Sequence, residues 1–282
     1  MKIARVRHEG RVLAARVDDG TVYPVVPEEA RHMADAVRDL IADGTARERL
    51  GADVPGVPLA EVELLSPLAA PQKIVCIGLN YADHIRETGL RTPEVPLAFV
   101  KTAHTLTGPT APLHVARGTT EQLDWEAELA VVIGRTARNV TAGEAADHVF
   151  GYTVANDVSA RDAQFSDGQW FRGKNFDGFC PLGPWIVTAD EVPDPHALAI
   201  GARVNGETVQ DSSTKEMIFG VGETLAYLSR YMTLYPGDVI ATGTPHGVGM
   251  GRDPQLWLHD GDVVETEVEG IGLLRNQVRL TG

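Results

Sequence analysis

The sequence predicts a mainly β protein of the α+β class, and three observations support this prediction. Of the 282 residues, 29 are glycine and 17 are proline, which is typical of chains with many turns between short strands. Short apolar, β-prone runs recur along the chain, whereas segments with helical periodicity are few. We find no regular alternation of strands and helices and no glycine-rich phosphate loop, which argues against a Rossmann or P-loop enzyme.

The first part of the chain, residues 1–66, is predicted to form a small β/α domain. Three β-prone runs between residues 3 and 26 are separated by turns at Gly10 and Gly20. A helical stretch of about 20 residues follows, with one apolar face made by Met33, Val37, Leu40 and Ile41. Prolines then replace the periodic pattern, so we place the domain boundary near residues 66–72.

The remaining residues, 70–282, are predicted to form a larger domain that consists mostly of strands. Candidate strands occupy residues 73–78, 129–133, 152–155, 185–187, 239–241 and 263–268. Helices are expected just after Asn80, near residues 142–148 and over residues 216–232. In the last of these, one apolar face is formed by Ile218, Val221, Leu225 and Leu228.

The charge balance excludes several classes of partner. The chain has 39 acidic and 25 basic residues and a net charge of −14, whereas nucleic-acid binders and proteins that dock on anionic membranes present a basic face. Cys76 and Cys180 lie far apart in apolar sequence, so we interpret them as buried thiols in a reducing compartment. The sequence shows no signal peptide and no apolar run long enough to span a bilayer, so a cytoplasmic location is expected.

Two glutamates stand two residues apart in the segment 123–134. If this segment is a strand, Glu126 and Glu128 share a face and repel unless a positive group lies between them. Either both face solvent at a strand end, or they form a site for a hard cation such as Mg²⁺ or Mn²⁺. Asp157 ends another candidate strand and could be a third ligand. Alternatively, it caps a helix that places Arg161 and Gln164 on the same face.

Five further residues have side chains suited to catalysis or anion binding. His84 and Glu87 are spaced so that on a helix the carboxylate could orient the imidazole as a general base, although an ordinary surface pair has the same spacing. Lys101 and Lys174 follow apolar or aromatic residues, and each could bind a buried anion or extend along apolar surface to water. Thr244 lies in a tight Gly/Pro loop whose hydroxyl and N–H groups could bind a carboxylate.

Taken in order, these segments resemble the fumarylacetoacetate hydrolase family, in particular its bacterial acylpyruvase and 2-hydroxyhepta-2,4-diene-1,7-dioate isomerase-like branch. The resemblance covers about three quarters of the chain and runs through residues 77–84, 126–128, 156–162, 173–177, 204–207 and 242–245. It implies a catalytic domain of the mixed β-roll or sandwich type over residues 70–282, behind the small N-terminal domain. It also implies a homodimer.

The same resemblance implies roles for the candidate residues. The metal ligands for Mg²⁺ or Mn²⁺ would be Glu126, Glu128 and Asp157. The catalytic residues would be an acid/base dyad of His84 and Glu87 on a lid, and an enolate-stabilising Lys174. The groups that bind substrate oxygens would be Arg161, Gln164 and Thr244. Lys101 matches a lysine at the equivalent position of family members, with no role assigned.

We therefore predict a divalent-metal-dependent hydrolase that cleaves a C–C bond in a small-molecule 2,4-dioxo acid through a metal-stabilised enolate. The substrate would be an acylpyruvate or, because residues 165–170 are polar enough to meet hydroxyl groups, a diketo-deoxy sugar acid. One alternative is an oxaloacetate decarboxylase or a 2-hydroxyhepta-2,4-diene-1,7-dioate isomerase/decarboxylase, which would need no attacking water. Another is a non-catalytic ligand-binding protein on the same fold.

Overall fold

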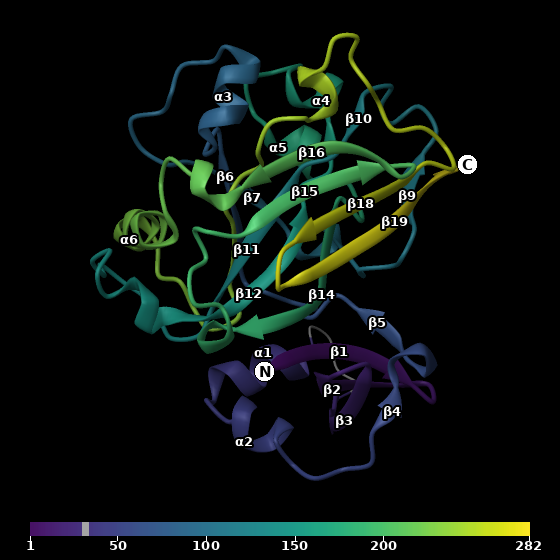
Figure 1. Cartoon of the computed structure of the whole chain (residues 1–282), viewed down its shortest axis with the longest axis vertical. Helices are drawn as coiled ribbons and strands as arrows, with labels where there is room; N and C mark the ends of the chain where they lie inside the picture. The colour runs from purple at the N-terminus through teal and green to yellow at the C-terminus, as the bar shows by residue number, and fades with distance from the viewer. Residues whose placement is uncertain (30–33) are drawn as a thin grey trace.

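The computed structural model describes residues 1–29 and 34–282 and is built mainly from strands, which confirms the predicted mainly β, α+β class (Figure 1). In the described residues the strands form a twelve-stranded sheet, a five-stranded sheet and a two-stranded ribbon. The main path of the large sheet runs in the order β4-β3-β2-β1-β14-β12-β11-β17-β6-β7, with β5 paired to β1 and β8 to β14.

The N-terminal strands form an antiparallel meander, drawn in purple to blue in Figure 1. Its strands are β1 (Lys2–His8), β2 (Arg11–Asp18), β3 (Thr21–Pro27), β4 (Val57–Pro58) and β5 (Glu63–Leu65). The two hairpin turns at Gly10 and Gly20 each have two consecutive residues with positive φ, the geometry that matches the twist of paired strands. Because β1 also pairs with β14, these strands extend the large sheet; the predicted division near residues 66–72 stays a prediction.

Two short helices occupy the region for which a single helical stretch is predicted. They are α1 (Ala36–Ala42) and α2 (Ala46–Leu50). Gly44, with a φ of +74°, lies between them in a left-handed conformation that a helix cannot include, which is why the stretch is broken. Val37, Leu40 and Ile41 are buried as predicted, and Met33 lies outside the described residues.

Asp35 joins α1 to the chain segment that precedes β6. One carboxylate oxygen accepts the N–H of Arg38 at 2.9 Å, and the other accepts the N–H groups of Ala69 and Ala70 at 2.7 and 3.0 Å. Asp35→Ala should therefore lower the free energy of unfolding by about 2 to 3 kcal/mol, because three backbone donors lose their buried acceptor. Urea unfolding measures this, with the exposed Asp53→Ala as control; a loss for Asp35→Ala no larger than that of the control would contradict the assignment.

The large sheet continues with strands from the rest of the chain. These are β6 (Ile74–Gly78), β7 (Leu97–Lys101), β8 (Leu106–Thr107), β11 (Ala127–Ile133), β12 (Val149–Asn156), β14 (Cys180–Thr188) and β17 (Val239–Ala241). The five-stranded sheet, in the order β16-β15-β18-β19-β9, consists of β9 (Leu113–Ala116), β15 (Ala199–Val204), β16 (Glu207–Ser213), β18 (Val263–Val268) and β19 (Gly272–Thr281). The ribbon pairs β10 (Leu123–Asp124) with β13 (Ser159–Ala160).

Strand β11 is buried on both faces, which explains its unbroken apolar sequence. Its odd-numbered residues, such as Leu129 and Val131, pack with Val264 and Leu274 of the five-stranded sheet. Its even-numbered residues belong to a second core cluster with Ile3 and with residues of α1 and β14. Glu128 is also even-numbered, so the alternation of the strand places it on the face opposite the five-stranded sheet.

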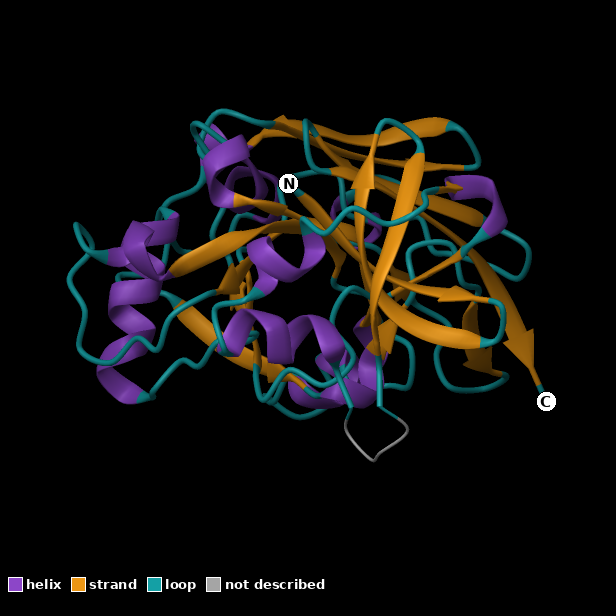
Figure 2. Cartoon of the chain, turned by 90° about the horizontal axis from the view of Figure 1, so that it is seen from below, coloured by secondary structure: helices purple, strands orange, loops and turns teal. Residues whose placement is uncertain are grey.

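The remaining helices are short apart from one. They are α3 (Ala82–Thr88), α4 (Arg161–Gln164), α5 (Phe171–Lys174) and α6 (Val221–Tyr231). Helix α6 begins five residues after the predicted start because residues 214–216 form a separate 3₁₀ turn. Helix α4 contains Arg161 and Gln164 of the alternative helix considered for Asp157 but begins at Arg161, and α5 is not predicted. Figure 2 shows how the helices lie around the strands. Single 3₁₀ turns occupy Leu59–Glu61, Ala103–Thr105, Ala145–His148, Ala189–Glu191, Thr214–Glu216 and Gly249–Gly251.

Both cysteines are free and buried, as predicted. Burial raises the pKa of the Cys180 thiol to about 12, which keeps it protonated at neutral pH. Among the described helices, none is both long and apolar enough to cross a membrane.

Candidate active site

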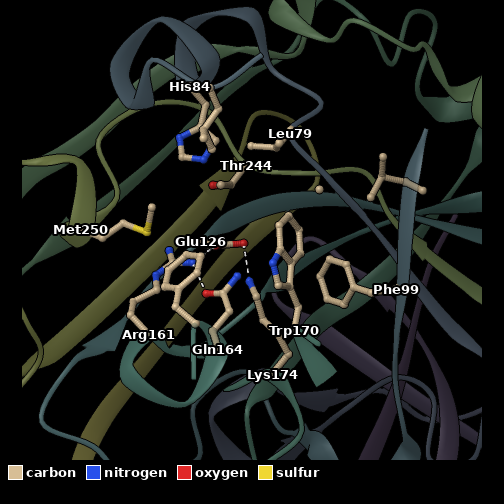
Figure 3. A pocket seen from close by; sticks show the side chains of 14 residues that line it. Leu79, His84, Phe99, Glu126, Arg161, Gln164, Trp170, Lys174, Thr244 and Met250 are labelled. Atoms are coloured by element: carbon tan, nitrogen blue, oxygen red, sulfur yellow. Dashed lines mark hydrogen bonds and ion pairs between the residues drawn. The ribbon is translucent and has the colours of Figure 1, made fainter. Parts of the chain in front are cut away.

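A cavity of about 50 Å³ lies between α3, α4, α5 and the end of β11 (Figure 3). Six of the nine predicted site residues line it: His84, Glu126, Arg161, Gln164, Lys174 and Thr244. Of the other three, Glu87 lies 3.1 Å from His84 and Asp157 pairs with Lys174, while a carboxylate oxygen of Glu128 lies within 4.8 Å of one of Glu126. The structure therefore brings together residues that are spread over more than half of the chain.

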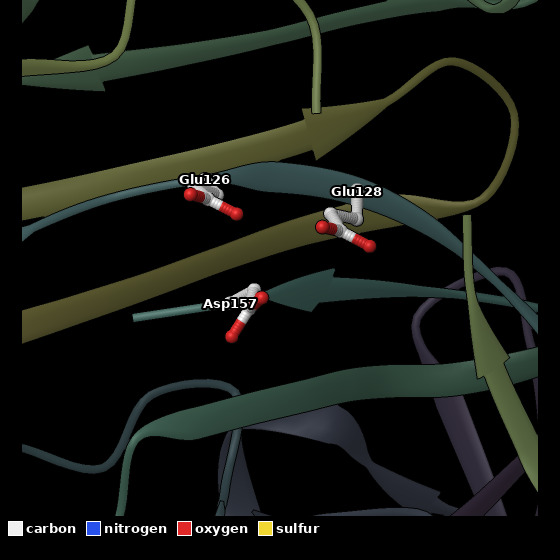
Figure 4. A group of neighbouring side chains, drawn as sticks. All are labelled: Glu126, Glu128 and Asp157. Carbon is white, nitrogen blue, oxygen red and sulfur yellow. The ribbon is translucent and has the colours of Figure 1, made fainter. Parts of the chain in front are cut away.

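The three acidic residues Glu126, Glu128 and Asp157 converge on one point (Figure 4). Glu126 immediately precedes β11, Glu128 lies within it, and Asp157 follows β12, which pairs with β11. Each offers a carboxylate oxygen, and the three oxygens lie within 4.8 Å of one another. All three side chains are buried, so the interpretation that Glu126 and Glu128 face solvent is wrong.

Two buried lysines compensate part of this negative charge. The ammonium group of Lys101 lies 2.5 Å from Asp157 and also donates to the carbonyl of Val158 at 3.2 Å. The ammonium group of Lys174 bridges Asp157 at 2.8 Å and Glu126 at 2.9 Å. Both lysines are about as buried as the carboxylates, so the interpretation that they extend to water is wrong.

Glu128 differs from the other two acids in its partners. Its carboxylate accepts the N–H of Gly243 at 2.9 Å, and among the described residues no cationic side chain lies within ion-pair distance of it. Burial, together with the charges of Asp157 and Glu126, raises its pKa well above the ordinary value. Burial also opposes ionisation of Glu126, but the attraction of Lys174 and Arg161 outweighs it and lowers the pKa of Glu126 to about 2.

This donor set fits a hard divalent cation. Clustered carboxylate oxygens are the ligands that Mg²⁺ and Mn²⁺ prefer. Two ammonium groups face three carboxyl groups, and among the described residues no cationic group is in contact with Glu128, which agrees with the raised pKa of that carboxyl group. A buried charge without a counter-ion is costly, and a bound cation would remove that cost.

Arg161 begins α4 and is held on three sides. Its Nε donates to Asp124 at 2.8 Å, and one Nη donates to Glu126 at 2.7 Å and to Gln164 at 2.9 Å. The other, Nη2, is buried and has no hydrogen-bond partner among residues 1–29 and 34–282. Asp157 is not on this helix and pairs with lysines instead, so the interpretation of Asp157 as a helix cap beside Arg161 is wrong. The free Nη2 is a donor available to a bound anion.

His84 lies on α3 at the opposite side of the cavity (Figure 3), and Glu87 is three residues further along the same helix. His84 Nδ1 is 3.1 Å from a carboxylate oxygen of Glu87, whose other oxygen accepts the N–H of Gly247 at 2.8 Å. His84 is buried, unlike a residue of an ordinary surface pair. Asp83 fixes the same helix by accepting a hydrogen bond from Ser212 and lying 3.0 Å from the ring of His246.

Thr244 is oriented by a residue that the sequence analysis does not single out. The buried Gln210 donates to the Thr244 hydroxyl at 2.9 Å, while its carbonyl oxygen accepts the N–H of Ala127 at 3.0 Å. Because the hydroxyl oxygen accepts this bond, its hydrogen remains available to a ligand. Gln210 lies on the five-stranded sheet, far from Thr244 in sequence, and no local pattern marks it.

One wall of the cavity is apolar. It is formed by Ile77, Leu79, Leu90, Phe99, Phe165, Trp170 and Met250. Trp170 packs edge-on against Phe99 and lies over Gly78, where a Cβ would come within 2.3 Å of its ring. In the loop 165–170 the two aromatic ends line the cavity, while the polar residues between them are exposed. Residues 166–169 therefore do not line the cavity, and the expectation that this loop meets substrate hydroxyl groups stays a prediction.

Comparison with known proteins identifies the family. The model of the fumarylacetoacetate (FAA) hydrolase C-terminal domain matches residues 73–279. The chain belongs to the fumarylacetoacetate hydrolase family. Among solved structures, the fumarylacetoacetate hydrolase of the psychrophile Exiguobacterium antarcticum is 43% identical, with a TM-score of 0.90 and complete coverage of both chains. The predicted family and fold are thus confirmed.

Curated relatives of the family carry different activities in their names. The 2,4-didehydro-3-deoxy-L-rhamnonate hydrolase of a Sphingomonas species is 43% identical over 99% of this chain and 96% of its own length. The mitochondrial oxaloacetate tautomerase Fahd2a of Rattus norvegicus is 44% identical over 93% of this chain and 83% of its own. The maleylpyruvate hydrolase of Sphingobium, solved with manganese(II) and pyruvate, is 31% identical with a TM-score of 0.83 and matches both chains over their full length. The chain is therefore an enzyme of a family that includes hydrolases, isomerases and tautomerases.

Proposed function

We propose that this protein is a divalent-metal-dependent hydrolase of 2,4-dioxo acids, either acylpyruvates or diketo-deoxy sugar acids. The observation that carries the proposal is the arrangement of one buried carboxylate triad, one imidazole–carboxylate pair and two cationic side chains around a single cavity. The hydrolases among the relatives support it, since one acts on a 2,4-dioxo sugar acid by name and another was solved with manganese and pyruvate.

The triad Glu126, Glu128 and Asp157 would hold Mg²⁺ or Mn²⁺. When bound there, such a cation supplies a Lewis acid for the oxygens of a 2-oxo acid. On the protein side, Lys101 and Lys174 limit the repulsion among the carboxylates, so that the site accepts both a cation and an anionic substrate.

The dyad would perform the proton transfers. Glu87 occupies Nδ1 of His84, which leaves Nε2 as the ring nitrogen available to the cavity that His84 lines. Nε2 would take a proton from water as the oxygen attacks the C4 carbonyl of the substrate. Cleavage of the C3–C4 bond then releases a carboxylic acid and leaves the electron pair on a pyruvate enolate, which takes up one proton at C3 to become pyruvate.

The cationic side chains would stabilise the negative charge that develops on the enolate. Lys174 borders the triad, and the unpartnered Nη2 of Arg161 is a donor without a ligand. Gln164 holds the guanidinium in place, and the Thr244 hydroxyl adds a second donor. The apolar wall around Trp170 would contact the acyl part of the substrate.

A second candidate function is the interconversion or decarboxylation of oxaloacetate. The observation that favours it is that relatives 44–47% identical are named oxaloacetate tautomerases. Such reactions also proceed through an enolate, but they need no attacking water.

A substrate panel tests the proposal. Purified protein with Mg²⁺ or Mn²⁺ should release pyruvate from an acylpyruvate or from a diketo-deoxy sugar acid faster than it acts on oxaloacetate. The reverse order would favour the second candidate. Protein that binds the metal but turns over no member of the panel would support the remaining alternative, a ligand-binding protein on this fold.

We also propose that the protein forms a homodimer, because the edge strand β7 leaves apolar side chains exposed. Leu97 and Val100 are 42% and 41% exposed, and Phe171 of the adjacent α5 is 46% exposed. Asn175 donates to the backbone carbonyls of both Val100 and Phe171, which places these residues side by side. An exposed apolar edge strand is a site where a second chain can add.

Light scattering during size-exclusion chromatography tests the dimer. The wild-type protein should elute with twice the mass of the chain, and Val100→Glu should elute as a monomer because the interface would bury an unpaired charge. Leu273→Glu on β19, a position 36% exposed, is the matched control and should leave the dimer intact. A monomeric wild-type protein would refute this part of the proposal.

The predicted cytoplasmic location stays a prediction, since several relatives are named as mitochondrial.

A further inference from the structure

Asp124 is a fully buried aspartate. It does not line the cavity, but its carboxylate accepts hydrogen bonds from four donors. One carboxylate oxygen accepts the N–H groups of Trp125 at 2.8 Å and Gly249 at 2.7 Å. The other accepts Nε of Arg161 at 2.8 Å and the N–H of Met250 at 3.1 Å. A single carboxylate thus connects Arg161 to the loop over residues 247–251.

The same loop holds the other side of the site. Gly247 donates to Glu87 at 2.8 Å, and Gly251 lies so close that a Cβ there would come within 2.4 Å of the Glu87 carboxyl group. Glu87 in turn binds His84 Nδ1 at 3.1 Å. A continuous chain of contacts therefore runs from Arg161 through Asp124 and the loop to the dyad.

The position of Asp124 is itself well defined. It lies on the ribbon strand β10, where it pairs with Ser159 of β13, two residues before Arg161. The backbone N–H of Arg161 donates to the carbonyl of Gln122, two residues before Asp124, at 3.0 Å. The ribbon thus fixes the backbone of Arg161, and the Asp124 carboxylate fixes its guanidinium group. The same carboxylate also binds the loop 247–251.

We propose that Asp124 is a positioning residue that couples the substrate-binding guanidinium of Arg161 to the His84–Glu87 dyad through the loop 247–251. It fixes the position of Arg161 relative to the dyad without contacting the reacting atoms. The activity test of this role rests on the proposed function. The hydrogen-exchange test does not, because the coupling between Asp124 and α3 is a property of the fold.

Asp124→Asn is the sharpest variant. Its amide oxygen can keep the two bonds to Trp125 and Gly249, but its NH₂ group then faces two donors, Nε of Arg161 and the N–H of Met250. Hydrogen exchange measured by mass spectrometry should show faster exchange in residues 247–251 and in α3. With the substrate that the panel identifies, kcat/KM should fall about 10- to 100-fold, while metal affinity measured by calorimetry stays unchanged.

Asp238→Asn is the matched control. Asp238 is also fully buried, accepts the N–H groups of Lys73 and Tyr235 and pairs with the Lys73 ammonium group, but it contacts none of the site residues. It should leave exchange in α3 and kcat/KM unchanged. Equal exchange of α3 in Asp124→Asn and in the wild type, or equal effects of the two variants on α3, would overturn the proposal.

Gly251→Ala tests the coupling from the dyad side if Asp124→Asn does not fold. The added methyl group displaces the loop from Glu87, so exchange should rise at Gly249 and Met250, the amides that Asp124 binds, as well as in α3. A rise confined to α3 would overturn the coupling. Absence of turnover by the wild-type protein would count against the proposed function alone, since the exchange comparison needs no substrate.

Discussion

The Glu128→Gln variant is expected to lose metal-dependent activity while its metal-free form becomes more stable than the wild type. Glu128 is buried beside two other carboxylates, and within the part of the chain that the structure describes no cationic side chain is in contact with it. At an effective dielectric constant of ~20, two unit charges separated by the 4.8 Å that bounds the triad repel by ~3 kcal/mol. Glutamine keeps the shape and can still accept the N–H of Gly243, but it removes a carboxyl group whose ionisation is disfavoured in the metal-free site.

After the attraction of the nearby lysines is subtracted, we expect a gain of ~1 kcal/mol or more, a rise in Tm of ~2 °C or more without metal. Metal affinity should fall at least about 10-fold and turnover by more than 100-fold. Removal of a direct metal ligand should reduce both more than removal of a residue that only contacts a ligand does. Thermal unfolding in the presence of a chelator, isothermal titration with Mn²⁺ and pyruvate release measure the three quantities.

Glu126→Gln is the informative comparison because it should have the same effect on activity and the opposite effect on stability. Glu126 forms ion pairs with Lys174 and Arg161, and its pKa is lowered to about 2. Its removal leaves these buried cations underpaired and should destabilise the metal-free protein by about 3 kcal/mol. If both variants shifted Tm in the same direction, the assignment of the uncompensated charge to Glu128 would be wrong.

The His84→Ala variant is expected to lose hydrolysis of 2,4-dioxo acids by about 10²- to 10⁴-fold, the usual contribution of a general base. His84 contacts Glu87 and lines the cavity, but it is not part of the triad, so metal affinity should be unchanged. Stopped-flow measurement of pyruvate release and calorimetry with Mn²⁺ test both statements.

His196→Ala is a suitable control, because His196 is partly exposed and contacts the N-terminus of α6 instead of the cavity. Oxaloacetate decarboxylation needs no attacking water, so it should survive in His84→Ala better than hydrolysis does. Undiminished hydrolysis by His84→Ala would exclude His84 as the base.

The sequence predicted much of the site because the chemistry is local to strand ends. Glu126 and Glu128 share a face by the two-residue period of a strand, and His84 and Glu87 share a helical turn by their spacing. Both relations require only neighbouring residues. The resemblance to the family then assigned roles to residues whose individual patterns were ambiguous, such as Asp157 and Lys174.

Contacts between distant segments could not be predicted in the same way. Asp124, Gln210 and Lys101 are set by the pairing of strands far apart in sequence, and each was either unnoticed or left without a role. The hairpin of β15 and β16 was also missed, although Asn205-Gly206 between two β-prone runs is a strong hairpin signal, and both residues have positive φ. That signal was available in the sequence, whereas the ion pairs of Lys101 were not.

The central claim is that the site stabilises an enolate of a 2-oxo acid and needs a divalent cation held by the triad. Exchange of the methyl protons of pyruvate in D₂O, followed by proton NMR, measures enolate formation without reference to which bond the enzyme breaks. We expect exchange with Mg²⁺ or Mn²⁺ present, and its loss on chelation, in Glu128→Gln and in Lys174→Met. Exchange that continues after chelation, or that persists in Glu128→Gln, would contradict the account.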